Sequence, residues 1–308
     1  MPCYHPLTMY RSRDGRSPVS GKWPLVSSPV GGYHDLPVTV PCGQCIGCRL
    51  ERSRVWAIRC IHEAQMHKQN CFITLTFNDK HLDKELSLRK EDFQKFMKRI
   101  RFHTGIKIRY YHCGEYGSLG LRPHHHAILF GYDFPDKVLW QVRNKIPLYR
   151  SALLEYLWPF GFCTVGNVTF ESAAYVARYI LKKITGARAQ DHYQGRVPEY
   201  NTMSRRPGIG KTWYDQYKSD VYPHGYVVIR KGLKVRPPRF YDNIYDLENH
   251  DSMLKIKAIR KMKFIKQIMR EEKKTYKSVC LFGQDSCRLS VKEQAKINQL
   301  KSLRRIIE

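Results

Sequence analysis

Acidic residues are scarce in this chain, in which 27 Asp and Glu stand against 54 Lys and Arg and leave a net charge of +27. An excess of this size favours a polyanionic partner. The chain also has 20 tyrosines and 13 phenylalanines distributed among the positive charges, which favours nucleic acid among the polyanions. Solvated lysine-rich surfaces explain a mildly basic protein more readily than they explain this excess.

Long hydrophobic runs are absent as well. No stretch approaches the ~20 consecutive apolar residues that span a bilayer, which argues against a membrane partner. The polar opening over residues 1–5 (MPCYH) is unlike a secretory signal, so we expect a soluble protein in a reducing cytoplasm. Ten cysteines in that compartment favour metal binding or buried thiols over disulfides.

A nucleoside triphosphate site is missing too. Gly210, Lys211 and Thr212 match the end of a P-loop, but Arg205 stands where the pattern G-x-x-x-x-G-K-T requires its first glycine. The sequence therefore predicts that ATP is not a cofactor.

Three of the cysteines have the spacing of metal ligands. Cys42, Cys45 and Cys48 form the pattern C-x-x-C-x-x-C. Tetrahedral zinc needs a fourth ligand, which Cys3 or His5 could supply from the start of the chain. An iron–sulfur cluster is the weaker alternative, because the ferredoxin pattern has a further cysteine followed by proline. The other cysteines lack this spacing and are expected to be buried thiols: Cys60, Cys71, Cys113, Cys163, Cys280 and Cys287.

Hydrophobic periodicity and turn residues divide the chain into helices and strands. One helix is expected to begin at a Ser87 cap, because Phe93, Phe96, Met97 and Ile100 recur at i, i+3, i+4 and i+7. The other expected elements are a helix over 51–68, strands over 72–77, 106–116 and 124–130, a helix over 148–158, a strand over 162–168, a helix over 171–184, a hairpin over 225–240 and two Lys-rich helices after residue 245.

These elements predict an α+β fold with a mainly antiparallel central sheet flanked by helices. Residues 1–49 are rich in Gly, Pro, Ser and Arg and show little periodicity, so we expect a loop-dominated, Cys-rich N-terminal arm with the candidate zinc site. Residues 50–245 are expected to form the main domain. Residues 246–308 are expected to form a basic helical C-terminal extension.

A histidine motif, P-H-H-H at residues 123–126, opens an apolar run typical of a strand. Residues two apart on a strand share a face, so His124 and His126 can hold one metal ion side by side. If residues 116 and 123 pair across the preceding turn, Glu115 lies opposite His124 and becomes the third candidate ligand. Imidazole with carboxylate suits Mg²⁺ or Mn²⁺, and such an ion could polarise a phosphodiester.

Two features leave this motif open to other interpretations. His125 occupies the middle position, where an apolar residue is expected, so spacing alone does not decide the ligand pair. Surface strands also carry H-x-H by chance, and zinc would accept the same donors.

A tyrosine pair lies on the helix expected over 171–184. Residues four apart are neighbours on a helix, so Tyr175 and Tyr179 present two phenols that could attack one phosphate in turn. Paired tyrosines on helices usually pack, but the apolar stripe of this helix falls on its other side. Lys182 follows Tyr179 by about one turn and could lower the pKa of the phenol or steady a phosphate; a solvated lysine is the alternative.

Basic residues are frequent near the end of the main domain. Those expected to clamp single-stranded phosphates are Arg205, Arg206, Lys211, Arg230, Lys231, Lys234 and Arg236. Trp213, Tyr214 and Tyr217 lie in the same stretch and are expected to stack on bases. The basic tail after residue 245 either holds DNA as well or forms a solvated helical surface.

The histidine and tyrosine motifs, in this order and spacing, resemble those of the HUH endonucleases, the rolling-circle replication initiators. More narrowly, the chain resembles the initiators of microviral single-stranded DNA phages of the gokushovirus type. The matching segments are residues 1–6, 42–49, 72–77, 114–131, 175–183 and 204–210. The resemblance implies an HUH-endonuclease fold, with His124, His126 and Glu115 as metal ligands, Tyr175 and Tyr179 as nucleophiles and Lys182 as the motif lysine.

The resemblance also implies an activity in the cytoplasm of a bacterial host cell. Such an enzyme nicks single-stranded origin DNA through a tyrosine, which leaves a 5′-phosphotyrosine and a free 3′-OH, and a second tyrosine later allows the ends to be rejoined. Host DNA polymerase extends the 3′ end, and a host helicase is expected because the chain shows no helicase domain. The alternatives are a plasmid-type HUH initiator or mobilisation relaxase, and a zinc-stabilised DNA-binding protein without catalysis.

Overall fold

A computed structural model of the chain describes residues 3–18, 21, 23–82, 84–117, 120–143, 145–178, 188–229, 232–279 and 285–302. The chain divides into two units. The first contains Met1–Glu51 with Lys273–Arg304, and the second contains Arg52–Glu272 with Arg305–Glu308. Among the described residues, no helix is both long enough and apolar enough to cross a membrane.

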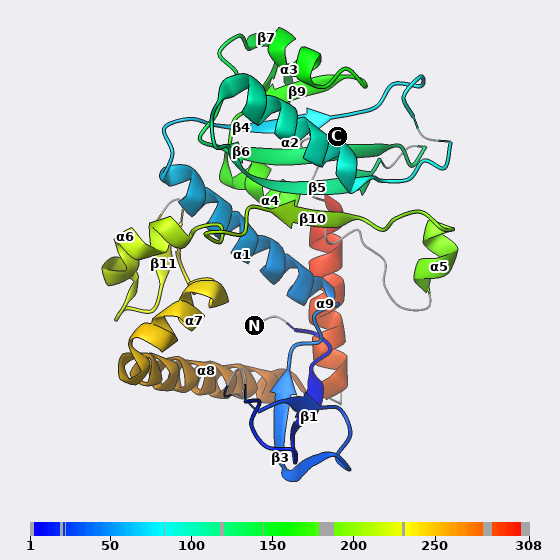
Figure 1. The fold of residues 1–308 in the computed structure, drawn as a ribbon. Helices are drawn as coiled ribbons and strands as arrows, with labels where there is room; N and C mark the ends of the chain where they lie inside the picture. The colour runs from blue at the N-terminus through cyan, green and yellow to red at the C-terminus, as the bar shows by residue number, and fades with distance from the viewer. Residues whose placement is uncertain are drawn as a thin grey trace. The chain divides into compact units, whose positions relative to one another are not determined.

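Seven of the described strands form one antiparallel sheet in the second unit, in the order β10-β5-β6-β4-β9-β8-β7 (Figure 1). The strands are β4 (Asn70–Leu75), β5 (Arg109–Tyr116), β6 (Pro123–Phe130), β7 (Val138–Arg143), β8 (Ile146–Arg150), β9 (Cys163–Gly166) and β10 (Tyr200–Met203). The predicted α+β fold with a mainly antiparallel sheet is confirmed.

Helices cover both faces of this sheet, because side chains on β4, β5 and β6 alternate between two separate apolar clusters. On β6, Ala127 and Leu129 pack with helices α2 and α3, whereas Ile128 and Phe130 pack with helices α1 and α4. The helices are α1 (Ile46–Gln65), α2 (Lys90–Thr104), α3 (Ala152–Leu157) and α4 (Phe170–Arg178). The alternation therefore places His124 and His126 on the face that α1 and α4 cover.

Helix α2 has the predicted apolar stripe but not the predicted cap. Its buried residues are Phe93, Phe96, Met97 and Ile100. The helix begins at Lys90, and its N-cap residue Arg89 makes no side-chain cap hydrogen bond. The Ser87 hydroxyl instead accepts a hydrogen bond from the backbone N–H of Val197, so a tertiary contact replaces the expected local one.

The predicted helix over 148–158 is wrong over its first residues. Residues 148–150 belong to β8, which pairs with β9, and α3 begins only after Ser151. The Ser151 hydroxyl accepts a hydrogen bond from the backbone N–H of Leu154 at 3.0 Å, which caps the helix at that position. Neither edge strand was predicted from the sequence, because β7 is exposed along most of its length and β10 is only four residues long.

The first unit contains a small sheet where loops were predicted. Strands β1 (Leu7–Ser12), β2 (Leu25–Val26) and β3 (Gly32–Val40) pair in the order β2-β1-β3. Most of their side chains are exposed, so the sequence has no clear alternation to indicate a strand. A Cβ atom at Gly32 would lie 2.5 Å from the Cβ of Tyr10, and the close pairing therefore requires glycine there.

The second unit continues beyond the sheet with α5 (Arg188–Tyr193), α6 (Lys211–Val221), β11 (Val227–Val228), β12 (Lys234–Val235), α7 (Arg239–Glu248) and α8 (His250–Val279). The hairpin predicted over 225–240 is confirmed by the pairing of Val227 with Val235. The two Lys-rich helices predicted after residue 245 are α8 and α9 (Asp285–Ser302). Helix α1 begins at Ile46, five residues earlier than predicted.

Candidate active site

The β5–β6 hairpin carries the three predicted metal ligands, and its register is the predicted one. Tyr116 pairs with Pro123, and Glu115 pairs with His124. Because directly opposed residues point to the same face, and because residues two apart on a strand do so as well, His126 joins the other two.

The donor atoms of this triad are close enough to share one ion. Glu115 Oε1 lies 2.5 Å from Nε2 of His124 and 3.0 Å from Nε2 of His126. Two ligands at right angles around an ion ~2.1 Å away are separated by about 3 Å, so these donors fit a metal centre. Glu115 and His126 are buried while His124 is partly exposed, which leaves one side of the triad open to a substrate.

Hydrogen bonds behind the triad orient both imidazoles. Nδ1 of His124 lies 3.1 Å from the carbonyl oxygen of Arg122, which can only accept, so Nδ1 donates. Nε2 of the same ring faces Glu115 and donates its proton there, and it is the nitrogen that would bind a metal once that proton is lost. Nδ1 of His126 lies 2.9 Å from the hydroxyl of Thr74 on β4. Thr74 was not among the residues predicted from the sequence, although the alternation along β4, where Ile73 and Leu75 face the other way, could have indicated it.

Glu115 is held in its ionised form. Burial raises the pKa of this carboxyl, but the hydrogen bonds from His124 and His126 outweigh burial and bring the pKa to about 2. Glu115 is therefore negatively charged at physiological pH, which is the form that binds a cation.

His125, the other histidine of the motif, lies on the opposite face of the sheet. Its ring contacts Phe77 with a centroid distance of 5.8 Å, and its Nδ1 lies 3.1 Å from Nε2 of His112. Burial, followed by the neighbouring charges of His124 and His126, lowers the pKa of His125 to about 3. The structure thus separates His125 from the triad, and His124 and His126 are the two histidines of the motif that lie beside Glu115.

Helix α4 brings the first motif tyrosine beside the triad. The helix begins with reciprocal hydrogen bonds, in which the Thr169 N–H donates to the Ser172 hydroxyl at 2.8 Å and the Ser172 N–H donates to the Thr169 hydroxyl at 3.1 Å. The Tyr175 ring lies edge-on to His126, with a centroid distance of 5.4 Å, and is partly exposed. Tyr179 and Lys182 lie outside the described residues, so their predicted positions remain expectations.

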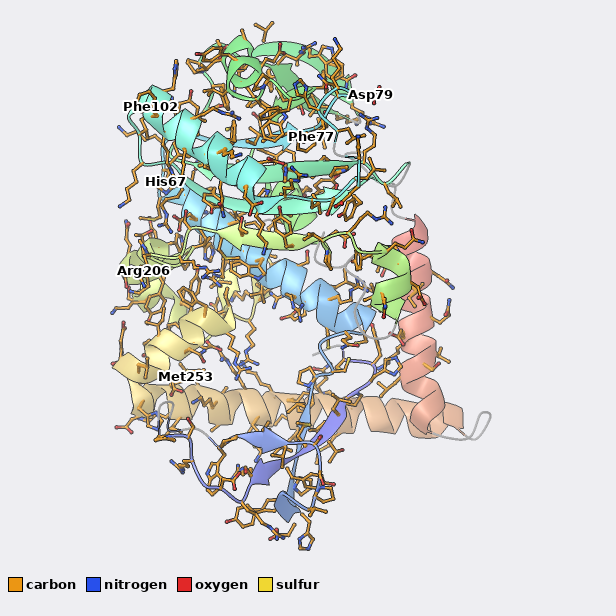
Figure 2. All side chains as sticks on the ribbon, turned by 45° about the vertical axis from the view of Figure 1, so that its right-hand side comes forward. His67, Phe77, Asp79, Phe102, Arg206 and Met253 are labelled. Carbon is orange, nitrogen blue, oxygen red and sulfur yellow. The ribbon has the colours of Figure 1, made fainter. Side chains whose placement is uncertain are left out.

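Two of the predicted phosphate-clamping residues lie at the other end of the sheet. Arg205 and Arg206 follow β10 and are exposed, and Arg109 at the start of β5 donates a hydrogen bond to the carbonyl of Arg206 at 3.4 Å. Strand β5 runs about 20 Å from this end to the triad at ~3.3 Å per residue. Figure 2 shows Arg206 and His67 toward one end of the strands, at the left of the view, and Asp79 toward the other end.

The remaining predicted clamp residues come later in the chain. Lys211 begins α6, and Lys234 and Arg236 are exposed in and after β12. Arg230 and Lys231 lie outside the described residues.

One expected base-stacking residue is unavailable to DNA. Tyr214 is fully buried in the cluster formed by α6, α7 and the start of α8, so the prediction that it stacks on bases is wrong. Trp213 stacks on His62 with a centroid distance of 3.5 Å, while Tyr217 stays partly exposed. Packing of α6 against the protein, which local spacing does not reveal, turns Tyr214 inward.

Four cysteines in the first unit form a second group of candidate ligands. The Sγ atoms of Cys3, Cys42, Cys45 and Cys48 all lie within 4.8 Å of one another. Zinc with four thiolates at ~2.3 Å separates the sulfurs by about 3.8 Å, so this spacing fits a tetrahedral site. The alternative fourth ligand, His5, lies 2.6 Å from a carboxylate oxygen of Glu293.

Backbone hydrogen bonds prepare this cysteine group for a cation. The N–H of Cys42 donates to Cys3 Sγ at 3.3 Å, and the N–H of Tyr4 donates to Cys45 Sγ at 3.4 Å. Burial raises the pKa of Cys45, but hydrogen bonds outweigh it and lower the pKa to about 6. Burial raises the pKa of Cys3, and burial with the neighbouring Cys3 and Cys45 raises the pKa of Cys48 to about 12, so the hydrogen bonds favour the thiolate at Cys45 in particular. The thiols expected to be buried, where the structure describes their side chains, are buried: Cys60, Cys71, Cys113 and Cys163.

The fold and the triad together define a class of protein: an antiparallel sheet presents two histidines and a carboxylate on one face, beneath a helix that carries a tyrosine. The family model of the replication-associated protein ORF2/G2P matches residues 70–184, which include the triad and Tyr175. No solved structure matches the chain significantly.

Three phage proteins are similar to the chain over most of its length. Replication-associated protein VP4 of Bdellovibrio phage phiMH2K is 36% identical over 233 residues, which cover 72% of each chain. Replication-associated protein ORF2 of Spiroplasma virus 4 is 34% identical over 228 residues, or 69% of each chain. Replication-associated protein ORF4 of Chlamydia phage 1 is 29% identical over 243 residues, or 72% of this chain and 58% of that one. The chain therefore belongs to the family of phage replication-associated proteins of the gokushovirus type.

Proposed function

We propose that the chain is a site-specific nickase and ligase for single-stranded origin DNA, which starts and finishes rolling-circle replication of a phage genome. The observation that carries the proposal is the convergence of Glu115, His124 and His126 within 4.8 Å, with the Tyr175 ring beside His126. A hydrolase that acts through water needs no phenol at this position.

Glu115, His124 and His126 would hold Mg²⁺ or Mn²⁺, since one carboxylate and two imidazoles suit these ions and leave coordination positions for phosphate oxygen. When bound, the ion supplies Lewis-acid polarisation of the scissile phosphodiester. The contribution of the chain is to keep Glu115 ionised and both imidazoles oriented through Arg122 and Thr74.

The chemical step belongs to the tyrosines. The Tyr175 oxygen attacks phosphorus, a P–O bond to tyrosine forms, and the bond to the 3′ oxygen breaks. The phenol loses its proton and the departing 3′ oxygen gains one, so no water is consumed. The phosphotyrosine conserves the phosphodiester, and rejoining therefore needs no ATP. Tyr179 would attack in turn, before or after Tyr175, and Lys182 would lower the pKa of the phenol or steady the phosphate.

The net charge of +27 supplies the general attraction to DNA. The residues we assign to phosphate contacts are Arg205, Arg206, Lys211, Arg230, Lys231, Lys234 and Arg236. A host helicase and a host polymerase in the bacterial cytoplasm would open and extend the nicked strand, while zinc on Cys3, Cys42, Cys45 and Cys48 would stabilise the first unit.

The test is transfer of DNA to the protein. A 5′-phosphotyrosine joins the protein to the downstream fragment, so single strands tiled over the phage genome and labelled at the 3′ end should give a labelled protein that survives boiling in detergent with Mn²⁺ present. Tyr175→Phe or Tyr179→Phe alone should still form one adduct, and the double variant should form none. His126→Ala should lose the adduct but keep DNA binding.

The outcomes separate the alternatives. Cleavage that leaves a free 5′-phosphate and no adduct would indicate a hydrolase. Binding without cleavage would indicate a zinc-stabilised DNA-binding protein. An adduct that persists in the double tyrosine variant would overturn the assignment of both nucleophiles.

A further inference from the structure

A cavity lies in the second unit, between the β11–β12 hairpin and α8, and no residue of the triad or of α4 lines it. Its volume is about 750 Å³. It is lined by residues 223–226, by residues 234–236 and by one face of α8. All of these residues fall outside the stretch that the family model matches.

The lining of this cavity is positively charged. Lys234, Arg236, Arg260 and Lys263 line it, and among the described residues no acidic side chain does. The buried carboxylate of Asp242 lies behind the wall, 3.3 Å from Nη2 of Arg236 and 2.6 Å from Nη1 of Arg260. One carboxylate therefore serves two guanidinium groups, and the surplus charge favours an anionic ligand.

Aromatic rings accompany these charges. The Tyr226 ring has the Lys234 ammonium 4.6 Å from its centroid and the His224 ring at 5.8 Å. Phe264 is 54% exposed although it is a large apolar residue, and it lines the same cavity. Exposed rings among basic residues are typical of proteins that stack unpaired bases while they hold the backbone.

Helix α8 presents its lining residues as one stripe, since positions 256, 259, 260, 263, 264 and 267 follow a helical spacing. The start of the helix is anchored by buried Met253 and Ile256. Gly225 allows the turn before β11 to approach the helix, because a Cβ there would lie 3.1 Å from Ile256, and its carbonyl accepts a hydrogen bond from Arg260 at 3.2 Å. The walls of the cavity are therefore held in place before a ligand arrives.

We propose that this cavity binds a segment of single-stranded DNA, with phosphates on Lys234, Arg236 and Lys263 and unpaired bases stacked on Phe264 and Tyr226. The inference deepens the proposed function and rests on it for the identity of the polyanion. Duplex DNA is disfavoured, because its base faces are covered by neighbouring bases and offer Phe264 nothing to stack on. The cavity would hold a part of the strand that the triad does not hold.

The experiment measures binding of the full chain to a fluorescent ~20-nucleotide oligothymidylate and to a duplex of the same length by anisotropy. Phe264→Leu, which keeps an apolar side chain but removes the ring, should weaken single-strand binding by about 5- to 100-fold and leave duplex binding unchanged. Phe264→Tyr should restore single-strand binding.

The salt dependence of DNA binding tests whether the lysines of the cavity contact phosphates. The double variant Lys234→Ala with Lys263→Ala should reduce the slope of log K against log salt by roughly 1.4 for single strands, about 0.7 for each lost phosphate contact. Lys261→Ala is the matched control, because it removes a charge from α8 outside the cavity. Equal melting temperatures for all variants would show that these exposed positions do not affect folding.

Two results would overturn the inference. If Phe264→Leu binds single strands as well as the wild type does, or loses duplex binding equally, the cavity does not stack bases. If instead Phe264→Leu weakens the binding of a polyglutamate peptide and leaves single-strand binding unchanged, the ligand of the cavity is an acidic protein segment.

The result of the DNA-binding measurement does not depend on whether the chain nicks DNA. The double tyrosine variant, which cannot form the covalent adduct, should still bind oligothymidylate, and adding Phe264→Leu to it should weaken that binding as it does in the wild type. Failure of the wild type to form any adduct would refute the proposed nickase activity. The measurement of single-strand binding to the cavity could still be interpreted.

Discussion

Single hydrogen bonds orient the imidazole rings of the triad. The hydroxyl of Thr74 lies 2.9 Å from Nδ1 of His126, and this contact orients the ring so that Nε2 points at Glu115. Partners of this kind fix the tautomer and the direction of a ligand, although they do not touch the metal.

Thr74→Val should therefore lower the apparent Mn²⁺ affinity by about 10- to 100-fold, measured as the concentration that gives half-maximal adduct. Thr74→Ser keeps the hydroxyl and should behave as the wild type. Thr76→Val is the matched control, since the Thr76 hydroxyl donates to the carbonyl of Phe162 and not to a ligand. An unchanged half-maximal concentration in Thr74→Val would show that Thr74 does not position His126.

Whole helices position the site by packing against opposite faces of the sheet. Helix α2 buries Ile100 completely, whereas Phe102 on the same helix is 94% exposed. The contribution of a residue to stability thus depends on the face of the helix, even where the exposed residue is the larger one.

Ile100→Ala should lower the free energy of unfolding by about 2–5 kcal/mol, because it leaves a cavity between α2 and the sheet. Phe102→Ala should change it by less than about 0.5 kcal/mol. Urea unfolding followed by the fluorescence of Trp158, which is buried in the same cluster, measures both. Equal losses from the two variants would contradict the packing of α2 described above.

At the scale of the whole molecule, two candidate metal centres of different chemistry lie in different units. The four thiols suit zinc, whereas the triad suits Mg²⁺ or Mn²⁺, so each ion should be removable without loss of the other.

The purified protein should contain about one zinc per chain. Cys45→Ser should lose it and destabilise the first unit, while the Mn²⁺ dependence of adduct formation by the triad should stay the same. Cys163→Ala, which removes a buried thiol outside the group, should retain zinc. Elemental analysis by mass spectrometry measures the zinc, and full zinc retention in Cys45→Ser would exclude the four-thiol site.

The domain boundaries also belong to this scale. The sequence analysis expects an arm over 1–49 and an extension over 246–308, and both remain predictions. In the structure the first unit combines residues from both ends of the chain, and His5 with Glu293 is one contact inside it.

Local patterns were sufficient for the α+β class, for the stripe on α2 and for the register that places Glu115 opposite His124. Each of these features depends on residues that are close in sequence. The two-residue period of a strand, the 3.6-residue period of a helix and a short turn allow few alternative arrangements of such residues. The same patterns failed for the small sheet in the first unit, whose exposed strands have no buried face to impose alternation.

Packing between distant segments decided the rest. It placed Cys3, rather than His5, together with the three other cysteines, placed Thr74 behind His126 and buried Tyr214, which was expected to stack on bases. Each of these contacts joins segments that are tens of residues apart. Hydrophobic periodicity indicates only on which face of its own helix or strand a residue lies. Which distant segment packs on that face is decided by the tertiary structure.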